Sequence, residues 1–420
     1  MRTLLLLTCL FVMGSASAWE KGRVKGDFGA SVREVAAGIR NYPNAALFGP
    51  DNDDDYYSET IIRLTASNVG IAGLPGLGVI EYHLVGGMVK TSMQSGAGLG
   101  GLSQSSGGRR YRDSLFEMDD KTWNEASARY YLNLDRANVK VPFSFGDLTG
   151  GRQAITFGET YFWNPLDIFN PFDARSFDRD YKQGVDVIRM DVPLGDFAGM
   201  NVVAGSYGRE SYYKENVFLF RCYGDLLGWD TSLQWGQLYG GNQFGYGFTG
   251  EAGAYEFRGE AAWFKSKIED RVPTAPGIRM LDDSFTGVLV MGRKVAEKVT
   301  VEAEYLYNGS GIPEHMNAGA VRVSSGDSLQ ISRQLAGVSV SWEAMPLLTA
   351  RFGTIYSFSD GSRAFQPGIT CSLSNESELV VGAVINMGKR PGTDATGFPR
   401  MRSEFGTNPD VGYIEFKGYF

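Results

Sequence analysis

The sequence predicts an all-β protein built as a single closed antiparallel transmembrane β-barrel of about 18 strands, with about 16 as the alternative. Three observations lead to this prediction: repeated stretches in which every second residue is apolar, connections that alternate between short and long, and a final segment that alternates up to the last residue. Successive side chains of a strand point to opposite faces, so each stretch has one apolar and one polar face. Such strands leave no unpaired edge in lipid only when the sheet closes on itself.

The segment from Val411 to Phe420 is the clearest of these stretches. Phe416 lies on its apolar face, whereas Glu415 and Lys417 lie on the other. A terminal amphipathic strand closed by Phe resembles the C-terminal signature of Gram-negative outer-membrane barrels. The resemblance implies that Phe420 serves membrane insertion and that the barrel-assembly machinery is a partner.

The other end of the chain is typical of a secretory signal peptide over residues 1–18. Arg2 is the positive region, Leu4 to Met13 is the apolar core, and Ala16-Ser17-Ala18 is an A-x-A cleavage site. The alternative is a membrane anchor helix, but an apolar run of about ten residues is too short for one, because spanning needs about 20. We expect residues 19–420 to form the barrel as one domain.

Interior segments show the same alternation. Val299 to Tyr305 and Ala336 to Glu343 each place apolar residues on one face and polar residues on the other. In a soluble sandwich the polar face would meet bulk water, whereas the chain ends favour apolar residues outward and charges toward a wet lumen. Short turns are predicted near 72–76, 144–149, 193–199, 224–228, 251–254, 294–298, 344–347 and 374–377. Longer links are predicted near 41–55, 93–125, 161–183, 265–282, 309–332 and 389–410, and briefer ones near 208–214, 240 and 359–363.

Composition argues against several function classes. The formal charge of −8 does not give the basic footprint of a nucleic-acid-binding protein, so we expect no nucleic-acid partner. His83 and His315 are the only two histidines, which disfavours a histidine-rich metal site or haem ligation, and no metal or other cofactor is expected. Cys222 and Cys371 are expected to be isolated thiols, with a disulfide as the alternative. The chain has no recognisable nucleophile elbow, zinc-protease motif or P-loop, so no catalytic residues are predicted and the protein is not expected to be an enzyme.

One stretch is unusual. Gly151 to Glu159 reads GRQAITFGE, and Asn164 to Asp173 reads NPLDIFNPFD. These segments resemble porin-like outer-membrane barrels in which an R-Q-x-x-x-(W/F)-G-E strand precedes a D-x-x-N-P-x-D loop. Alternation predicts that Ile155 and Phe157 face lipid. The aromatic content and Asn-Pro steps predict a loop folded against the wall or into the lumen as a constriction, with an aromatic cap at the membrane surface as the alternative. The residues assigned to this constriction are Phe162, Trp163, Asp167, Asn170 and Asp173.

Alternation also predicts which charged side chains line the lumen. They are Arg63, Glu81, Arg152, Arg189, Asp191, Arg293, Glu302, Glu304 and Arg351. Arginines that face carboxylates across a narrow channel would order water and select among polar solutes. The alternative is that these pairs only solvate and stiffen the wall.

We therefore expect a porin-like channel in the cell outer membrane for passive diffusion of small hydrophilic solutes. One alternative is a barrel that sheathes a partner such as a periplasmic multihaem cytochrome, and another is an extracellular β-protein or adhesin. Outer-membrane lipids and lipopolysaccharide are expected partners, and assembly into a homo-oligomer stays open. The cluster of Arg109, Arg110 and Arg112 is expected in a loop that faces lipopolysaccharide or is solvated, rather than in a substrate funnel.

Overall fold

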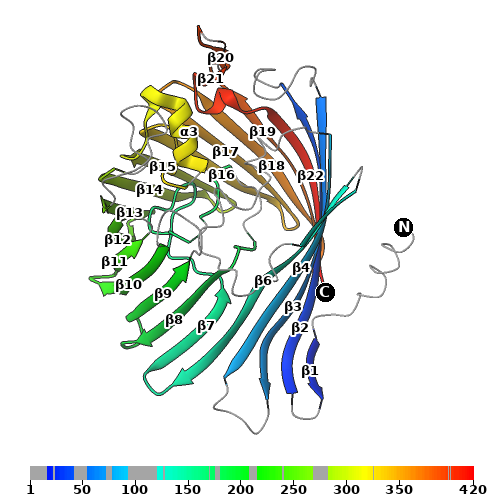
Figure 1. Ribbon diagram of the computed structural model, residues 1–420, viewed down its shortest axis with the longest axis vertical. Coiled ribbons are helices and arrows are strands. Elements are labelled where there is room, and N and C mark those ends of the chain that lie inside the picture. The colour runs from blue at the N-terminus through cyan, green and yellow to red at the C-terminus, as the bar shows by residue number, and fades with distance from the viewer. Residues whose placement is uncertain are drawn as a thin grey trace.

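The protein is described by a computed structural model, and its β-strands enclose a central space (Figure 1). The structure describes residues 17–21, 24–41, 54–71, 78–92, 121–125, 128–169, 171–175, 180–207, 215–238, 241–267, 282–324, 326–395, 397 and 399–420. The predicted signal peptide and the Arg109, Arg110 and Arg112 cluster lie, apart from residues 17 and 18, outside these ranges.

An antiparallel barrel of 18 strands forms the wall, which confirms the predicted fold. Its strands are β2 (Val24–Arg40), β3 (Asp54–Ile71), β4 (Val79–Thr91), β6 (Ala128–Phe143), β7 (Gly146–Gln153), β8 (Val185–Pro193), β9 (Gly199–Tyr207), β10 (Glu215–Leu226), β11 (Trp229–Leu238), β12 (Gly241–Ala252), β13 (Tyr255–Ser266), β14 (Ser284–Ala296), β15 (Val299–Asn308), β16 (Gln334–Met345), β17 (Leu348–Ser357), β18 (Arg363–Ser374), β19 (Ser377–Met387) and β22 (Asp410–Tyr419). Each strand pairs with the next in the chain, and pairing of β2 with β22 closes the barrel. The backbone groups of Ala30 and Phe420 exchange two hydrogen bonds at this seam.

Short elements supplement the wall. β1 (Ser17–Lys21) pairs with β2, and β5 (Lys121–Glu125) pairs with β6. β20 (Gly392–Thr393) and β21 (Pro399–Arg400) form a separate hairpin. The described helices are η2 (Pro313–His315), α3 (Met316–Ser324) and η3 (Phe405–Thr407). No helix in the described ranges has the length and apolar character needed to cross a membrane.

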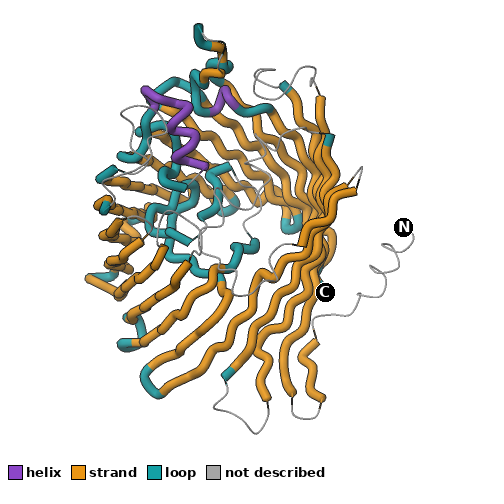
Figure 2. Tube along the Cα trace, in the orientation of Figure 1, coloured by secondary structure: helices purple, strands orange, loops and turns teal. Residues whose placement is uncertain are grey.

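The connections follow the predicted alternation of short and long. Two-residue turns join strands at 144–145, 227–228, 253–254, 297–298, 346–347 and 375–376, each inside a predicted short link. The long connections leave from the opposite ends of the strands, and some of them turn into the central space (Figure 2). The first wall strand, β2, begins on the side of the short turns, and the last, β22, ends on the same side.

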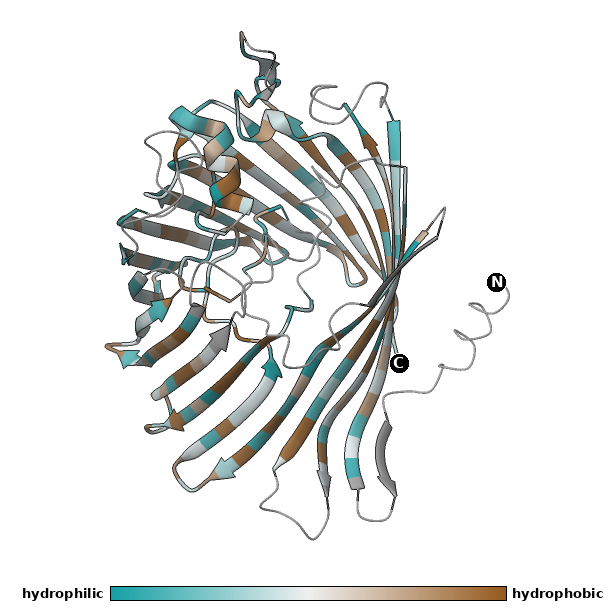
Figure 3. Cartoon of the chain, viewed as in Figure 1, coloured by the Kyte–Doolittle hydropathy of each residue, from teal (hydrophilic) through white to brown (hydrophobic). Residues whose placement is uncertain are grey.

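Hydrophobic and hydrophilic residues succeed one another along the strands (Figure 3), and burial alternates on strands such as β22. On β22, Ile414 and Phe416 point outward and are exposed, whereas Tyr413 and Glu415 point inward and are buried. The inward row is not polar everywhere: Val187, Val203 and other apolar residues on it pack against a chain segment inside the barrel. The lumen is therefore not lined by charged, hydrated residues throughout, because a chain segment inside the barrel covers part of the inner wall.

Cys222 and Cys371 are both free thiols, as the sequence predicts.

Candidate functional site

The candidate site is the inward segment, the described part of residues 154–184 (154–169, 171–175 and 180–184), which leaves the end of β7 and crosses the inside of the barrel. Strand β7 ends at Gln153, two residues after Gly151, whose φ of 115° is a conformation that other residues rarely adopt. Beyond this point Ile155 and Phe157 are buried against the inward valines of β8, β9 and β10. The prediction that these two residues face lipid is wrong, because the chain turns inward before their alternation can continue as a strand.

Two glutamates of the wall hold the segment through its backbone. Glu304 of β15 accepts hydrogen bonds from the amide groups of Tyr161, Phe162 and Trp163, at 3.1, 2.9 and 2.8 Å. Glu260 of β13 accepts from the amide groups of Glu159 and Leu166, at 2.6 and 3.0 Å. Hydrogen bonds to a carboxylate are about twice as strong as neutral ones, so these two side chains fix the position of the inward segment.

Gly245 and Gly247 of β12 leave a notch in which the side chain of Leu166 sits; a Cβ atom at Gly247 would lie 2.9 Å from Ser232 and 3.1 Å from Leu166. A Cβ atom at Gly337 of β16 would lie 2.5 Å from the ring of Phe162. Real Cβ atoms essentially never approach other atoms to less than 3.0 Å, so glycine at Gly247 and Gly337 allows contact between the segment and the wall.

The far part of the segment reaches the opposite wall. Asp180 pairs with Lys417 of β22 at 2.6 Å, and Tyr181 lies against the guanidinium of Arg63, 4.1 Å from the ring centre. Lys182 forms a buried ion pair with Asp167 inside the segment itself. The segment therefore bridges β13 and β15 on one side to β3 and β22 on the other, and it narrows the lumen.

An irregularity in β6 builds a charged cluster beside this bridge. The pairing of β4 with β6 shifts by one residue at Asp135, so that both Asp135 and Arg136 point inward. Asp135 binds Arg63 at 2.5 Å and Arg136 at 3.2 Å, and its other oxygen accepts from the amide of Gly184. The cluster ties β3 and β6 to the end of the inward segment.

Arg152 holds the point where the segment leaves the wall. Its side chain is 0% exposed, binds both carboxylate oxygens of Asp186 at 2.7 and 2.8 Å, and donates to the carbonyl of Leu134. Asn138 joins Glu81 to the backbone carbonyl of Arg152. A fully paired and buried guanidinium has little contact with solutes, so this geometry favours a role in holding β6, β7 and β8 together.

A row of arginines borders the beginning of the segment and retains contact with solvent. The guanidinium groups of Arg189 and Arg221 lie 5.9 and 5.4 Å from the ring centre of Phe157. Arg221 also faces Glu159 at 3.6 Å, and Arg189 binds Asp191 at 2.7 Å. Arg258 of β13 continues the row and pairs with Glu302. Charged groups of both signs therefore border the narrowed part of the lumen.

The remaining predicted residues lie in different places. Arg351 lies on the inward row of β17, together with Ile355. Asp173 binds Arg175 within the inward segment, and Asn170 lies outside the described residues. Arg293 belongs to the outward row of β14, next to Met291, and stacks on Tyr255 at 4.8 Å. The prediction that Arg293 lines the lumen is therefore wrong.

A second segment, residues 401–409, folds into the mouth of the barrel above the first. Its Phe405 packs in the same buried cluster as Phe162 and Trp163. The carboxylate of Glu404 accepts hydrogen bonds from the amide groups of Ile331 and Ser332, both at 3.0 Å. Burial raises the pKa of Glu404 to about 6, although these hydrogen bonds oppose the shift. This contact connects the 309–333 and 388–409 connections to the narrowed lumen.

The sequence analysis did not single out several residues of this site, among them Glu260, Asp135, Arg136, Lys182, Arg221, Arg258 and Glu404. Glu260 follows the alternation of β13 and could have been found by the same parity that identified Glu304. Asp135 and Arg136 could not, because the shifted register changes which residues point inward.

Comparison with known proteins supports the fold. No protein-family model matches this chain, and no curated protein matches its sequence. Among solved structures, Acinetobacter baumannii OccAB3 is 9% identical with a TM-score of 0.54, and the match covers 94% of this chain and 98% of that chain. Pseudomonas aeruginosa OccK7 (OpdD) is 10% identical with a TM-score of 0.53, covering 94% and 98%. The outer membrane protein OpdK of Pseudomonas aeruginosa is 9% identical with a TM-score of 0.52, also covering 94% and 98%. At such low identity the likeness establishes a shared barrel fold.

Proposed function

We propose that this protein is an outer-membrane channel for the passive diffusion of small hydrophilic solutes. The observation that carries the proposal is the inward segment, which Glu260 and Glu304 hold across the inside of a closed barrel. A barrel with an apolar outer surface and charged inner groups offers polar solutes a path through lipid, and a fixed inward segment sets the width of that path. The fold is one that outer-membrane porins share.

The charges at the narrowed part would determine which ions pass most readily. Arg189 and Arg221 approach the segment from one wall, and the side chain of Arg189 is 27% exposed. A cation in contact with solvent attracts anions and repels other cations over a Debye length of about 10 Å. The arginine row therefore favours anions locally, although the whole chain is acidic.

Planar-bilayer recordings of the purified full chain test both parts of the proposal. We expect discrete conductance steps, and a reversal potential in a salt gradient that shifts toward cation preference when Arg189→Gln and Arg221→Gln are combined. Lys294→Gln with Lys298→Gln is the matched control, because it removes the same charge at exposed positions beside a short turn. Absence of conductance would reject the channel, and an unchanged reversal potential would reject the role of the arginines.

The two alternative functions receive less support. A barrel that encases a cytochrome needs its lumen for the partner, whereas here the chain's own segment bridges opposite walls. An adhesin does not require this bridge. Outer-membrane lipids, lipopolysaccharide, the barrel-assembly machinery and further copies of this chain stay proposals as partners, as does membrane insertion through Phe420.

A further inference from the structure

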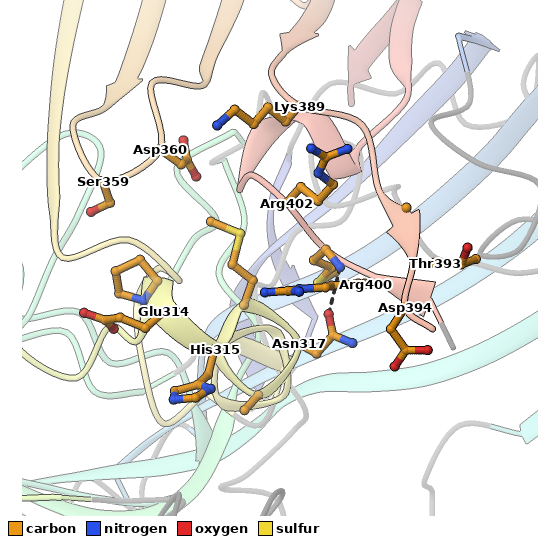
Figure 4. Close-up of a pocket in the computed structure, with 15 residues that line it drawn as sticks. Glu314, His315, Asn317, Ser359, Asp360, Lys389, Thr393, Asp394, Arg400 and Arg402 are labelled. Atoms are coloured by element: carbon orange, nitrogen blue, oxygen red, sulfur yellow. Dashed lines mark hydrogen bonds between the residues drawn. The ribbon is translucent and has the colours of Figure 1, made fainter. Parts of the chain in front are cut away.

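A cavity of about 870 Å³ lies between two of the long connections, those after β15 and after β19. The η2–α3 helical segment lines one side, and the described residues of the β20–β21 hairpin with Lys389, Met401 and Arg402 line the other (Figure 4). Ser359 and Asp360, from the connection after β17, complete the lining. Its size falls within the range of about 300–1,000 Å³ that is usual for small-molecule sites. The cavity is separate from the inward segment 154–184.

Three cationic side chains approach this cavity without an acidic partner. Lys389, Arg400 and Arg402 line it, and none of them forms an ion pair with another described residue. In Figure 4 Arg402 lies between Lys389, whose side chain extends toward Asp360, and Arg400, which lies beside Asn317 of the helix. The amide groups at the start of a helix add partial positive charge on the helical side.

Three acidic residues, Glu314, Asp360 and Asp394, also line the cavity, and each of them makes contacts of its own. Asp360 accepts hydrogen bonds from the amide groups of Ser362 and Glu404, at 2.7 and 2.8 Å. Glu314 pairs with Arg333 at 3.1 Å. No ion pair joins any of these carboxylates to Lys389, Arg400 or Arg402 among the described residues, so the three cationic groups stay available to an anion.

The walls of the cavity are held in place independently of any ligand. The side-chain oxygen of Asn317, in the first turn of α3, accepts from the amide of Met401 at 2.8 Å. Glu404 ties the same segment to Ile331 and Ser332, and Phe405 anchors it in the buried cluster below. A site whose walls are fixed in advance loses less entropy when it binds a ligand.

We propose that this cavity binds a sugar phosphate ester, with the phosphate held by Arg400, Arg402 and Lys389. Two guanidinium groups and one ammonium group match the charge and several acceptor oxygens of a phosphate dianion. The polar remainder of the cavity suits a hydroxylated body better than an apolar one. The same chemistry occurs in free sugar phosphates and in the phosphorylated sugars of lipid A. This inference goes beyond the proposed channel, because binding at the mouth does not require permeation.

Isothermal titration of the full chain in detergent tests the site without using conductance. Glucose 6-phosphate and lipid A are titrated separately at constant ionic strength, with glucose as the uncharged comparator. We expect saturable binding of at least one phosphorylated probe. In the Arg400→Gln, Arg402→Gln double variant the affinity should fall by about tenfold or more. Lys294→Gln with Lys298→Gln, which removes the same charge at the opposite end of the barrel, should bind as the wild type does.

The outcomes distinguish a free sugar phosphate from lipid A as the ligand, and they distinguish failure of this site from failure of the proposed channel. Binding of glucose 6-phosphate identifies a soluble ligand, and binding of lipid A alone identifies the envelope lipid. The inference is overturned if neither phosphorylated probe saturates, if glucose binds equally well, or if the double variant binds like the wild type. Lys389→Gln gives a second test if the double variant does not fold. A channel that conducts but binds neither probe would leave the proposed function intact and remove only this site.

Discussion

The contact between Glu304 and the inward segment gives the most specific prediction of this structure. Replacing Glu304 with Gln keeps the size of the side chain but removes its charge and turns one acceptor oxygen into a donor group. Three backbone amide groups, those of Tyr161, Phe162 and Trp163, then compete for one neutral oxygen. At least one buried amide loses its partner.

The expected weakening follows from the strength of these bonds. A hydrogen bond to a charged group contributes about 1.5–3 kcal/mol, and a buried donor without a partner costs about 1–3 kcal/mol. We therefore expect local detachment of the segment to become easier by about 2–4 kcal/mol in Glu304→Gln. Since about 1.4 kcal/mol changes an equilibrium tenfold, amide exchange at residues 161–163 should accelerate roughly 30-fold to several hundredfold.

Hydrogen–deuterium exchange of the folded protein, resolved to the peptide containing residues 161–163, measures this effect. Glu302→Gln is the matched control, because Glu302 lies two residues away on the same inward row but binds Arg258 rather than the segment. Exchange in this control should stay close to that of the wild type. If Glu304→Gln also exchanges within about threefold of the wild type, the three bonds do not hold the segment and the reasoning fails.

Three further predictions concern other parts of the same architecture. Gly337→Val should push the ring of Phe162 away from β16, since even a Cβ atom there would lie 2.5 Å from it, and the single-channel current should change in bilayer recordings. Arg152→Ala should lower the free energy of unfolding by about 3–5 kcal/mol in urea titrations, because Asp186 is left buried without its partner; a loss below about 1 kcal/mol would contradict this. The pKa of Glu404 is raised to about 6 from 4.5, so its protonated form stabilises the docked segment at low pH, and this stabilisation of about 2 kcal/mol is lost as pH rises through about 6. In the wild type, amide exchange of residues 331–332 should therefore become less protected as pH rises through about 6. In Glu404→Gln this change in protection should be absent.

The positions of the strands could be predicted because each one carries its own signal. Alternation over about ten residues marks a strand with one lipid-facing side. Gly or Asn marks the turns at 227–228, 253–254 and 375–376. The turn at 297–298 and the inward position of Glu304 both follow from the alternation of a single segment, Val299–Asn308. Closure of β2 on β22 then follows from the need to pair every edge in lipid.

Alternation fails where the backbone leaves regular geometry. Ile155 and Phe157 have the spacing of lipid-facing residues, yet the strand ends at Gln153 and both side chains are buried inside. Arg293 lies on the outward row, where a strand near its end has left the hydrocarbon and a charged group can stack on Tyr255.

Sequence separation hides the rest of the site. Glu304 and the amides it binds are more than 140 residues apart, as the separation of 141 from Trp163 shows, and no local pattern connects them. The same holds for Asp180 and Lys417, which are separated by 237 residues. Parity gives the face on which a side chain lies, but only the closed barrel determines which segment it meets.

The most direct test of the account is the single-channel conductance of the wild type beside that of the Glu260→Gln, Glu304→Gln double variant. The account predicts discrete, steady openings for the wild type, and larger or strongly fluctuating currents for the variant, whose inward segment is released from both wall carboxylates. A wild type without conductance, or a folded double variant with currents indistinguishable from it, would contradict the account.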